Sequence, residues 1–288
     1  MSTIAANAAH TRVEPTRDAR RLALYFGALI AVYVVGVLAL RPTEANGNSQ
    51  NWALVVMAAP TVGALAARLL GPGVIVWGRL NWWLFAGLLP IAVGLLGYWL
   101  AASVGLIAMD SPLVVAALTG ARFSVPMAML SATGEEIGWR GFLWPLVRRR
   151  FTLMPAVLIV TAIWWIYHVP VVLMGWYGSV SGLPAFTVAI FGFGCFVSVI
   201  TDRSHAIWPS VVAHGGWNAL VATAFVAGFT GHSTLIGEFG WVAAVSMLLL
   251  GVAALTWHLA TGGGHRLSYP AHFGSDWTAD TRNNTTVS

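Results

Sequence analysis

Long apolar stretches alternate with short polar segments along most of this chain, and each is close to the roughly 20 residues that a helix needs to cross a bilayer. The predicted spans are residues 22–40, 52–70, 82–106, 122–148, 152–174, 184–202, 207–229 and 241–260. The pattern therefore predicts an all-α, polytopic transmembrane helix bundle with about eight spanning helices.

Residues 111–120 form a further apolar stretch that is too short to cross a bilayer alone. We expect a short outer-leaflet or re-entrant segment here. The alternative is that these residues form the outer part of a fourth spanning helix that is kinked at Pro126.

Polar residues dominate only the two ends of the chain. We expect residues 1–21 to form a cytoplasmic polar segment, residues 22–261 a single transmembrane domain, and residues 262–288 a flexible polar tail. The first apolar run is too long for a signal peptide and lacks a clear small-residue cleavage site, which predicts a retained first helix.

The composition agrees with a membrane protein, because 58% of the residues are apolar and only 9% are charged. The mean hydropathy is +0.75. Such a chain lies far from the composition of a soluble globular protein of this length. We expect an integral membrane protein with the lipid bilayer as its surroundings, and the pattern carries no signal for an oligomeric state.

All fifteen basic residues are arginines, and the net charge is +5. One set of segment ends carries Arg12, Arg17, Arg20, Arg21, Arg68, Arg79, Arg148, Arg149, Arg150, Arg203 and Arg266. The opposite loops carry Arg41, Glu44, Asp110, His232 and Glu238. Because basic residues gather in cytoplasmic loops, this placement predicts that both termini are cytoplasmic. It explains the charge without a nucleic-acid partner.

Two adjacent carboxylates, Glu135 and Glu136, interrupt the fourth apolar stretch and are the only acidic residues between Asp110 and Asp202. An ionisable group at the bilayer centre costs roughly 2.5 to 3.5 kcal/mol on insertion scales. Two in succession therefore need partners. Arg140 lies one helical turn after Glu136 and is the nearest candidate.

Helical rise places ionisable groups of three predicted helices at a similar depth. Glu135 is 13 residues before Arg148, which corresponds to about 20 Å. His168 lies about 24 Å beyond Thr152, and His214 about 17 Å beyond Arg203, measured from the same side. Asn218 shares a helix face with His214, as Trp164 does with His168. These groups can line one buried pocket, with Trp164 as part of its wall.

The residue types in this layer fit two chemistries. A buried glutamate and a histidine can together activate water, while an imidazole and a carboxamide can donate hydrogen bonds to an oxyanion. The same layer could instead hold zinc, with His168, His214 and a glutamate, Glu135, as ligands. The residues alone leave both open.

Two other interpretations give the polar layer no hydrolytic role. It could join helices as a buried network, although two carboxylates with one nearby arginine exceed what that needs. It could also form an ion or proton path. The first three spans contain no repeat of the polar set, whereas many transporters consist of two related halves.

Three short motifs in this layer resemble one known family. Residues 135–140 (EEIGWR) are similar to its EExxxR motif, residues 164–168 (WWIYH) to FxxxH, and residues 214–218 (HGGWN) to HxxxN. In this order they resemble the CPBP family, the bacterial relatives of the CAAX prenyl proteases that include the Abi proteins. The resemblance covers roughly residues 112–230.

The resemblance implies a bundle of about eight helices that hydrolyses peptide bonds of membrane-embedded or membrane-anchored substrates in a bacterial cell membrane. By analogy, Glu135 activates water with His168, and His214 and Asn218 bind the oxyanion. Members have been described as metalloproteases, and a metal-independent glutamate mechanism is the competing view. We favour the mechanism without a cofactor, with zinc as the alternative.

Two further residues have an organising role by the same analogy, namely Glu136 and Arg140. Trp164 stands where the family motif often has Phe, which changes the shape of the pocket and leaves the substrate open. Nothing in this chain indicates a prenylated substrate. The alternative function is a catalytically silent membrane scaffold or a bacteriocin-immunity-like protein on the same fold.

Overall fold

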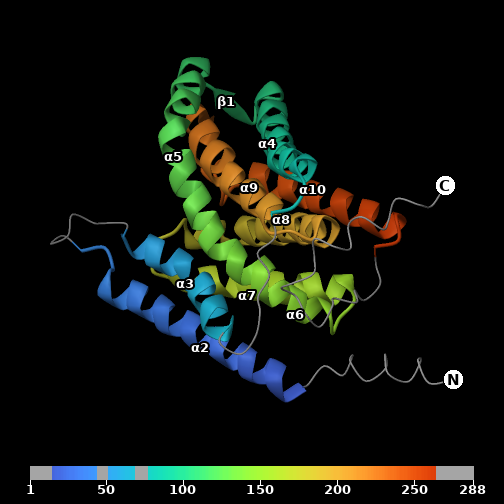
Figure 1. Ribbon diagram of the computed structural model, residues 1–288. Helices are drawn as coiled ribbons and strands as arrows, with labels where there is room; N and C mark the ends of the chain where they lie inside the picture. The colour runs from blue at the N-terminus through green and yellow to red at the C-terminus, as the bar shows by residue number, and fades with distance from the viewer. Residues whose placement is uncertain (1–14, 44–50, 69–76, 264–288) are drawn as a thin grey trace.

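The computed structural model describes residues 15–43, 51–68 and 77–263, and most of them are helical (Figure 1). The first part contains α2 (Pro15–Ala39), α3 (Asn51–Arg68), α4 (Leu80–Ser103), β1 (Ile107–Met109) and α5 (Ser111–Gly138). The second part contains η3 (Trp139–Leu143), α6 (Trp144–Arg148), α7 (Leu153–Leu173), η4 (Val180–Gly182), α8 (Leu183–Ser204), α9 (Trp208–Gly216), η5 (Trp217–Ala224), η6 (Phe225–Gly228), β2 (Phe229–Gly231) and α10 (Trp241–Ala260).

Each of the eight predicted spans corresponds to a helical segment of the structure. Seven of these segments are long and apolar enough to cross a membrane, and α3 is a shorter apolar helix. Within the described residues the only strand pairing joins β1 to β2, antiparallel. The all-α membrane bundle predicted from the sequence is confirmed. The predictions for residues 1–14 and 264–288 lie outside the described residues.

The expectation of a separate element at residues 111–120 is wrong, because α5 begins at Ser111 and continues through Pro126. The Asp110 side chain caps this helix by accepting a hydrogen bond from the backbone N–H of Leu113 at 3.1 Å. Pro112 stands in the first turn, where the missing N–H costs nothing. With its cap in place, the apolar stretch simply extends the fourth spanning helix.

A proline inside α3 creates a link to α7. Pro60 has no N–H, so the carbonyl of Val56, four residues earlier, has no helical donor. The hydroxyl of Tyr167 on α7 donates to this carbonyl. The residue next to the candidate site residue His168 is thereby fixed to α3.

Glycines allow α3 to lie directly against the end of α5. A Cβ atom at Gly138 would lie 2.5 Å from the backbone carbon of Pro60, and one at Gly134 would lie 2.7 Å from the oxygen of Met57. The Thr61 hydroxyl also donates to the Gly134 carbonyl at 2.6 Å. The turn of α5 that carries the paired glutamates is therefore packed against backbone.

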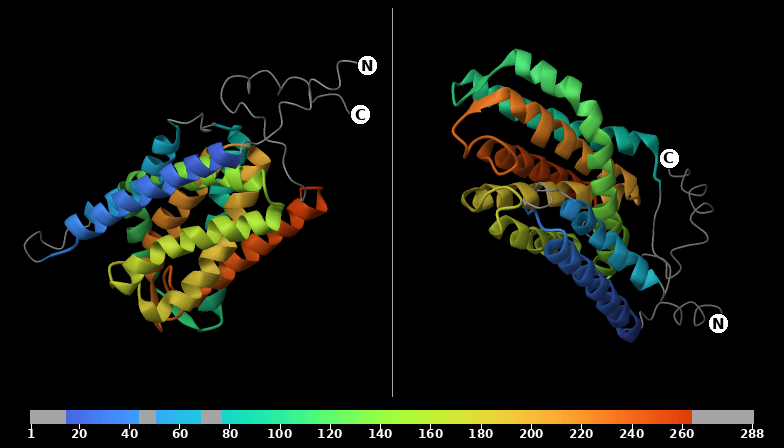
Figure 2. Two further views of the ribbon diagram at one scale, coloured as in Figure 1. Left: turned by 90° about the horizontal axis from the view of Figure 1, so that it is seen from below. Right: turned by 90° about the vertical axis from the view of Figure 1, so that its left-hand side faces the viewer.

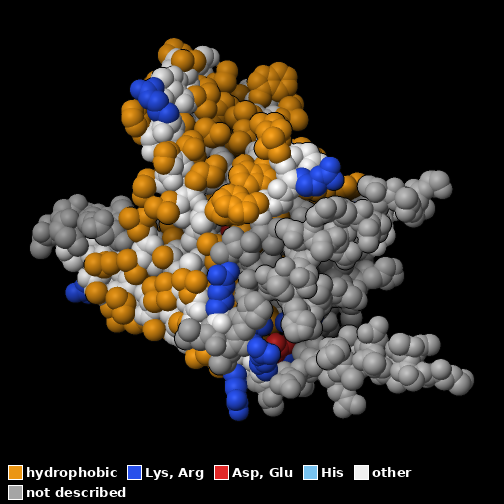
Figure 3. Space-filling view, viewed as in Figure 1, with side chains coloured by type: hydrophobic (Ala, Val, Ile, Leu, Met, Phe, Trp, Pro, Cys, Tyr) orange, Lys and Arg blue, Asp and Glu red, His pale blue; other side chains and the backbone are white. Residues whose placement is uncertain are grey.

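The bundle has a buried centre and an apolar exterior. The apolar window of α8 is 67% buried, whereas that of α5 is only 11% buried. Gly192 of α8 and Gly251 of α10 bring these two helices into backbone contact. Helix α2 packs beside α3 along one edge of the bundle (Figure 2). Hydrophobic side chains cover much of the described surface in Figure 3, as lipid contact requires.

Candidate functional site

The paired glutamates lie at the end of α5, and both are almost completely buried. Glu135 is 2% exposed and Glu136 is 0% exposed. The helix changes to π geometry immediately afterwards, in η3, and Arg140 lies on that segment. A second π segment, η5, begins at Trp217, three residues after His214, and carries Asn218. Short π segments often occur at functional sites, because they alter which side chains face together.

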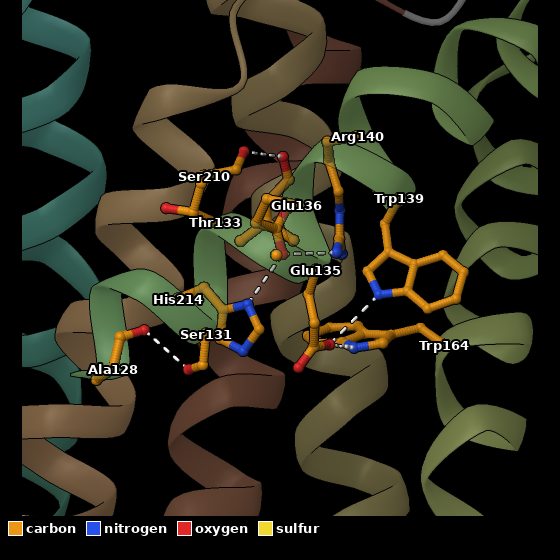
Figure 4. A network of polar contacts seen from close by, with 12 residues as sticks. Ala128, Ser131, Thr133, Glu135, Glu136, Trp139, Arg140, Trp164, Ser210 and His214 are labelled. Carbon is orange, nitrogen blue, oxygen red and sulfur yellow. Dashed lines mark hydrogen bonds and ion pairs between the residues drawn. The ribbon is translucent and has the colours of Figure 1, made fainter. Parts of the chain in front are cut away.

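Glu136 has two charged or ionisable partners. Its Oε1 atom accepts hydrogen bonds from Nη1 of Arg140 at 2.9 Å and from Nδ1 of His214 at 3.0 Å (Figure 4). The Arg140 guanidinium also lies over the ring of Trp164, 4.5 Å from its centroid. Glu136 thus holds His214 by one nitrogen and leaves the other nitrogen, Nε2, on the far side of the ring.

Glu135 has a different environment, made of two neutral donors. Its Oε2 atom accepts from the indole N–H of Trp164 at 2.7 Å and of Trp139 at 3.3 Å. Figure 4 shows the other carboxylate oxygen pointing away from both indoles. One oxygen is therefore anchored and the second is available to a reactant.

The bond from Trp139 to Glu135 adds a residue to the site that was not among the candidates from the sequence. The i,i+4 spacing of Glu135 and Trp139 on one helix is the signal that could have indicated it. Trp164 was expected to form part of the pocket wall, and the structure places it there.

His168 is oriented by the same tryptophan that anchors Glu135. Its Nδ1 atom lies 2.8 Å from the backbone carbonyl of Trp164. Because a carbonyl can only accept, Nδ1 carries the hydrogen, and in the neutral ring Nε2 keeps its lone pair. Trp164 therefore positions the glutamate with its side chain and the histidine with its backbone.

One cavity joins the candidate residues of four helical segments. Glu135 of α5, His168 of α7, His214 of α9 and Asn218 of η5 all line it. The cavity is partly open to the exterior, and its empty space, including the open part, is about 720 Å³. The other polar positions of the predicted set, Glu136 and Arg140, lie behind this wall. Much of the remaining lining is aromatic: Trp52, Trp164, Tyr167, Tyr177, Phe186, Phe193 and Trp217.

A third carboxylate, that of Glu238, also lines the cavity. The sequence placed it in a loop on the outer side, where it served only as a marker of topology. It lies in the segment between β2 and α10. Its position a few residues before a spanning helix was the available signal, but that position alone does not distinguish a pocket residue from a solvated loop.

The residues considered as zinc ligands are not grouped around one point in the structure. Among the residues that the structure describes, no group of three His, Cys, Asp or Glu side chains is arranged to hold a metal ion. Glu135, His168 and His214, the ligands considered from the sequence, line the cavity without forming such a cluster. The chemistry proposed below uses side chains alone.

These features define an integral membrane protein whose helices surround a largely apolar cavity with glutamate, histidine and asparagine side chains in its wall. Residues 116–220 match the family model described as Type II CAAX prenyl endopeptidase Rce1-like. The chain thus carries an Rce1-like domain, and the resemblance to the CAAX proteases indicated by the three motifs is confirmed. At family level, this match supports a CAAX-type intramembrane endopeptidase. No curated protein gives a significant match to the chain.

Proposed function

We propose that this protein hydrolyses peptide bonds of membrane-associated proteins or peptides, using Glu135 and His168 to activate water. One observation carries the proposal. Glu135, His168, His214 and Asn218 come from four helical segments that are distant in the sequence, and all four line a single cavity. A buried network that served only to join helices would have no reason to leave these groups facing empty space.

The first step requires a base that is fixed but not neutralised. The anchored Oε2 of Glu135 keeps the carboxylate in place, and the second oxygen can take a proton from water as the water oxygen attacks the peptide carbonyl carbon. A carboxylate that accepts from neutral indoles remains a stronger base than one paired with a guanidinium, because hydrogen bonds from charged donors are stronger. Nε2 of His168, with its lone pair, is a second acceptor in the same cavity.

The second step requires donors for the oxyanion that forms on the former carbonyl oxygen. The Nδ1–H of His214 donates a hydrogen bond to Glu136. With a second hydrogen on Nε2 the ring is an imidazolium, and the charge of Glu136 balances it. This Nε2–H and the Asn218 carboxamide can both donate to the oxyanion. The proton taken from water then moves to the peptide nitrogen, the C–N bond breaks, and a carboxylic acid and an amine leave.

Glu136 and Arg140 act as positioning residues in this scheme. Their ion pair, 2.9 Å long and fully buried, fixes the carboxylate that orients His214. The mechanism needs no metal, and chelator resistance of the purified, active protein would support that part of the proposal.

The deciding experiment replaces Glu135 by Gln, which keeps the shape of the side chain and removes the base. We expect hydrolysis of peptides in detergent micelles or bilayers to fall by about 10²- to 10⁴-fold. Asp110→Asn is the matched control, because Asn is also a good helix cap and Asp110 is outside the cavity. Full cleavage by the Glu135→Gln variant would refute the mechanism. A cellular phenotype that persists in this variant would favour the scaffold interpretation.

We also propose the orientation that the arginines predicted, with both termini on the cytoplasmic side of a bacterial cell membrane. In the structure Arg149 and Arg150, after α6, pair with Asp18 at the start of α2, which joins two segment ends of the predicted cytoplasmic side. Reporter fusions at each terminus test this: an active periplasmic reporter at either end would contradict it.

A further inference from the structure

Glu238 lies at one end of the cavity, where several helices begin or end. Helices α3, α8 and α10 begin at this end and α7 finishes there, as the contact between Trp52 and Trp176 at 5.4 Å and that between Phe186 and Phe239 at 4.5 Å indicate. This is the end assigned to the outer side from arginine placement. The carboxylate of Glu238 thus belongs to the outer rim of the cavity.

The backbone around Glu238 is fixed on both sides. The ring of Phe239 stacks on Phe186 with an interplanar angle of 7° and meets Tyr177 edge to face. The Gly237 N–H donates to the Tyr98 hydroxyl at 2.9 Å. Glu238 is therefore held between two anchored neighbours, and its side chain lines the cavity while remaining partly exposed.

Within the part of the chain that the structure describes, the carboxylate of Glu238 forms no ion pair with an arginine in the cavity wall. The Tyr177 hydroxyl donates a hydrogen bond to it. No arginine is present among the described residues that line the cavity. The ionisable groups that face it are His168, His214, Glu135 and Tyr177. A carboxylate placed this way complements a cation and repels an anion.

We propose that Glu238 is a specificity-determining residue that binds a cationic group of the substrate, a lysine or arginine side chain on the outer side of the scissile bond. This inference rests on the proposed function. The aromatic rings of Trp52, Tyr177 and Phe186 line the same cavity and provide surfaces for the alkyl part of such a side chain. A substrate with a negative group at this position is disfavoured by the same carboxylate.

The test uses the full-length protein in detergent micelles and pairs of peptides that differ only by lysine or norleucine at one position. Both peptides have blocked termini, so the side chain carries the only charge, and the position is varied on each side of the cleaved bond. We expect kcat/KM to favour lysine by about tenfold at one position, as for one charge-assisted contact. A third peptide with a free N-terminal amine separates terminal amines from side chains as the bound cation.

Two variants test whether Glu238 causes the preference for lysine. In Glu238→Gln the lysine to norleucine ratio should fall to about one, and comparing the ratio within a variant cancels any change in overall rate. Asp110→Asn removes one charge from the same side of the molecule, outside the cavity, and should keep the wild-type ratio. A wild-type ratio near one at every position, or an unchanged ratio in Glu238→Gln, would overturn the proposal.

Binding of the same peptides to the Glu135→Gln variant separates this inference from the proposed function. Cleavage without discrimination between the peptides would leave the protease function intact and reject the role of Glu238. If no peptide is cleaved, the protease function fails. Tighter binding of the lysine peptide, lost when Glu238→Gln is added, would still support the cation site, and equal binding would reject it.

Discussion

Two buried carboxylates of this protein, Asp202 and Glu135, both accept hydrogen bonds from tryptophan but have different roles. Oδ2 of Asp202 on α8 accepts from Nε and Nη2 of Arg148, at 3.0 and 2.8 Å, and Oδ1 accepts from the Trp144 indole at 3.1 Å. Nε2 of His258 lies 3.5 Å from Oδ2. Glu135 also has tryptophan donors, but both are neutral, both reach one oxygen, and the residue lines a cavity.

The two carboxylates differ in how much of their charge and how many of their oxygens the hydrogen-bond partners occupy. At Asp202 a guanidinium balances the charge and the donors occupy both oxygens, so the carboxylate ties α6, α8 and α10 together. At Glu135 one oxygen is held and the other is left to a reactant. A buried acid that is paired with arginine is most simply structural, whereas one held by neutral donors at a cavity keeps its capacity to take a proton.

The largest contrast is expected from neutralising the two carboxylates in parallel. Asp202→Asn leaves Arg148 buried without its counter-charge, and we expect a loss of about 3 to 5 kcal/mol of stability. Glu135→Gln should change stability little while abolishing hydrolysis. Unfolding of both variants in detergent, measured beside peptide cleavage at a temperature where both are folded, checks this. Equal destabilisation would remove the distinction between the two sites.

The two histidines offer a second matched pair. His258 accepts a hydrogen bond from Nε of Arg203 at 2.6 Å and is 3% exposed, whereas His168 faces the cavity. We expect His258→Gln to lower stability by about 1 to 3 kcal/mol and His168→Gln to lower kcat by about 10²-fold. Thermal unfolding and initial rates distinguish them. A large loss of kcat in folded His258→Gln would contradict the assignment.

A smaller effect is expected from removing one indole donor from Asp202 or from Glu135. Trp144→Phe deletes the bond to Asp202, and we expect a loss of about 1 to 2 kcal/mol in unfolding free energy. Trp164→Phe deletes the 2.7 Å bond to Glu135 but keeps the backbone carbonyl that orients His168. We expect kcat to fall about tenfold, because a 1.4 kcal/mol loss corresponds to that factor. An unchanged kcat would mean that Trp139 alone anchors the base.

These pairs also show what the sequence could and could not predict. The spans followed from hydrophobic length, and the residues of the cavity followed from spacing within helices and from helical rise between them. Asp202 and Arg148 were visible only as charges near span ends, because their pairing joins positions 54 residues apart. No local periodicity encodes such a contact.

The remaining differences concern connections between helices. The hydrophobic pattern alone could not decide whether residues 111–120 were separate, since a cap at Asp110 determined where α5 begins. Phe239, next to Glu238, stacks on Phe186, and this contact links the segment between β2 and α10 to the start of α8. Loop packing of this kind depends on side chains from several helices, and therefore on the assembled fold.

The last prediction concerns pH and separates Glu238 from both other carboxylate sites. Burial raises the pKa of Glu238 above its usual value and the nearby Glu135 adds to this, while the Tyr177 hydrogen bond, His168 and His214 act in the opposite direction. Because the acid is neutral below that raised pKa, the preference for lysine over norleucine should be full at high pH and fall as the pH decreases through it. The loss should begin at a higher pH than for an ordinary glutamate, whose pKa is about 4.3. Cleavage ratios measured across pH test this, because titration of the catalytic groups affects both peptides alike. In Glu238→Gln the ratio should stay near one at every pH; a pH-dependent ratio in that variant would assign the titration to another group.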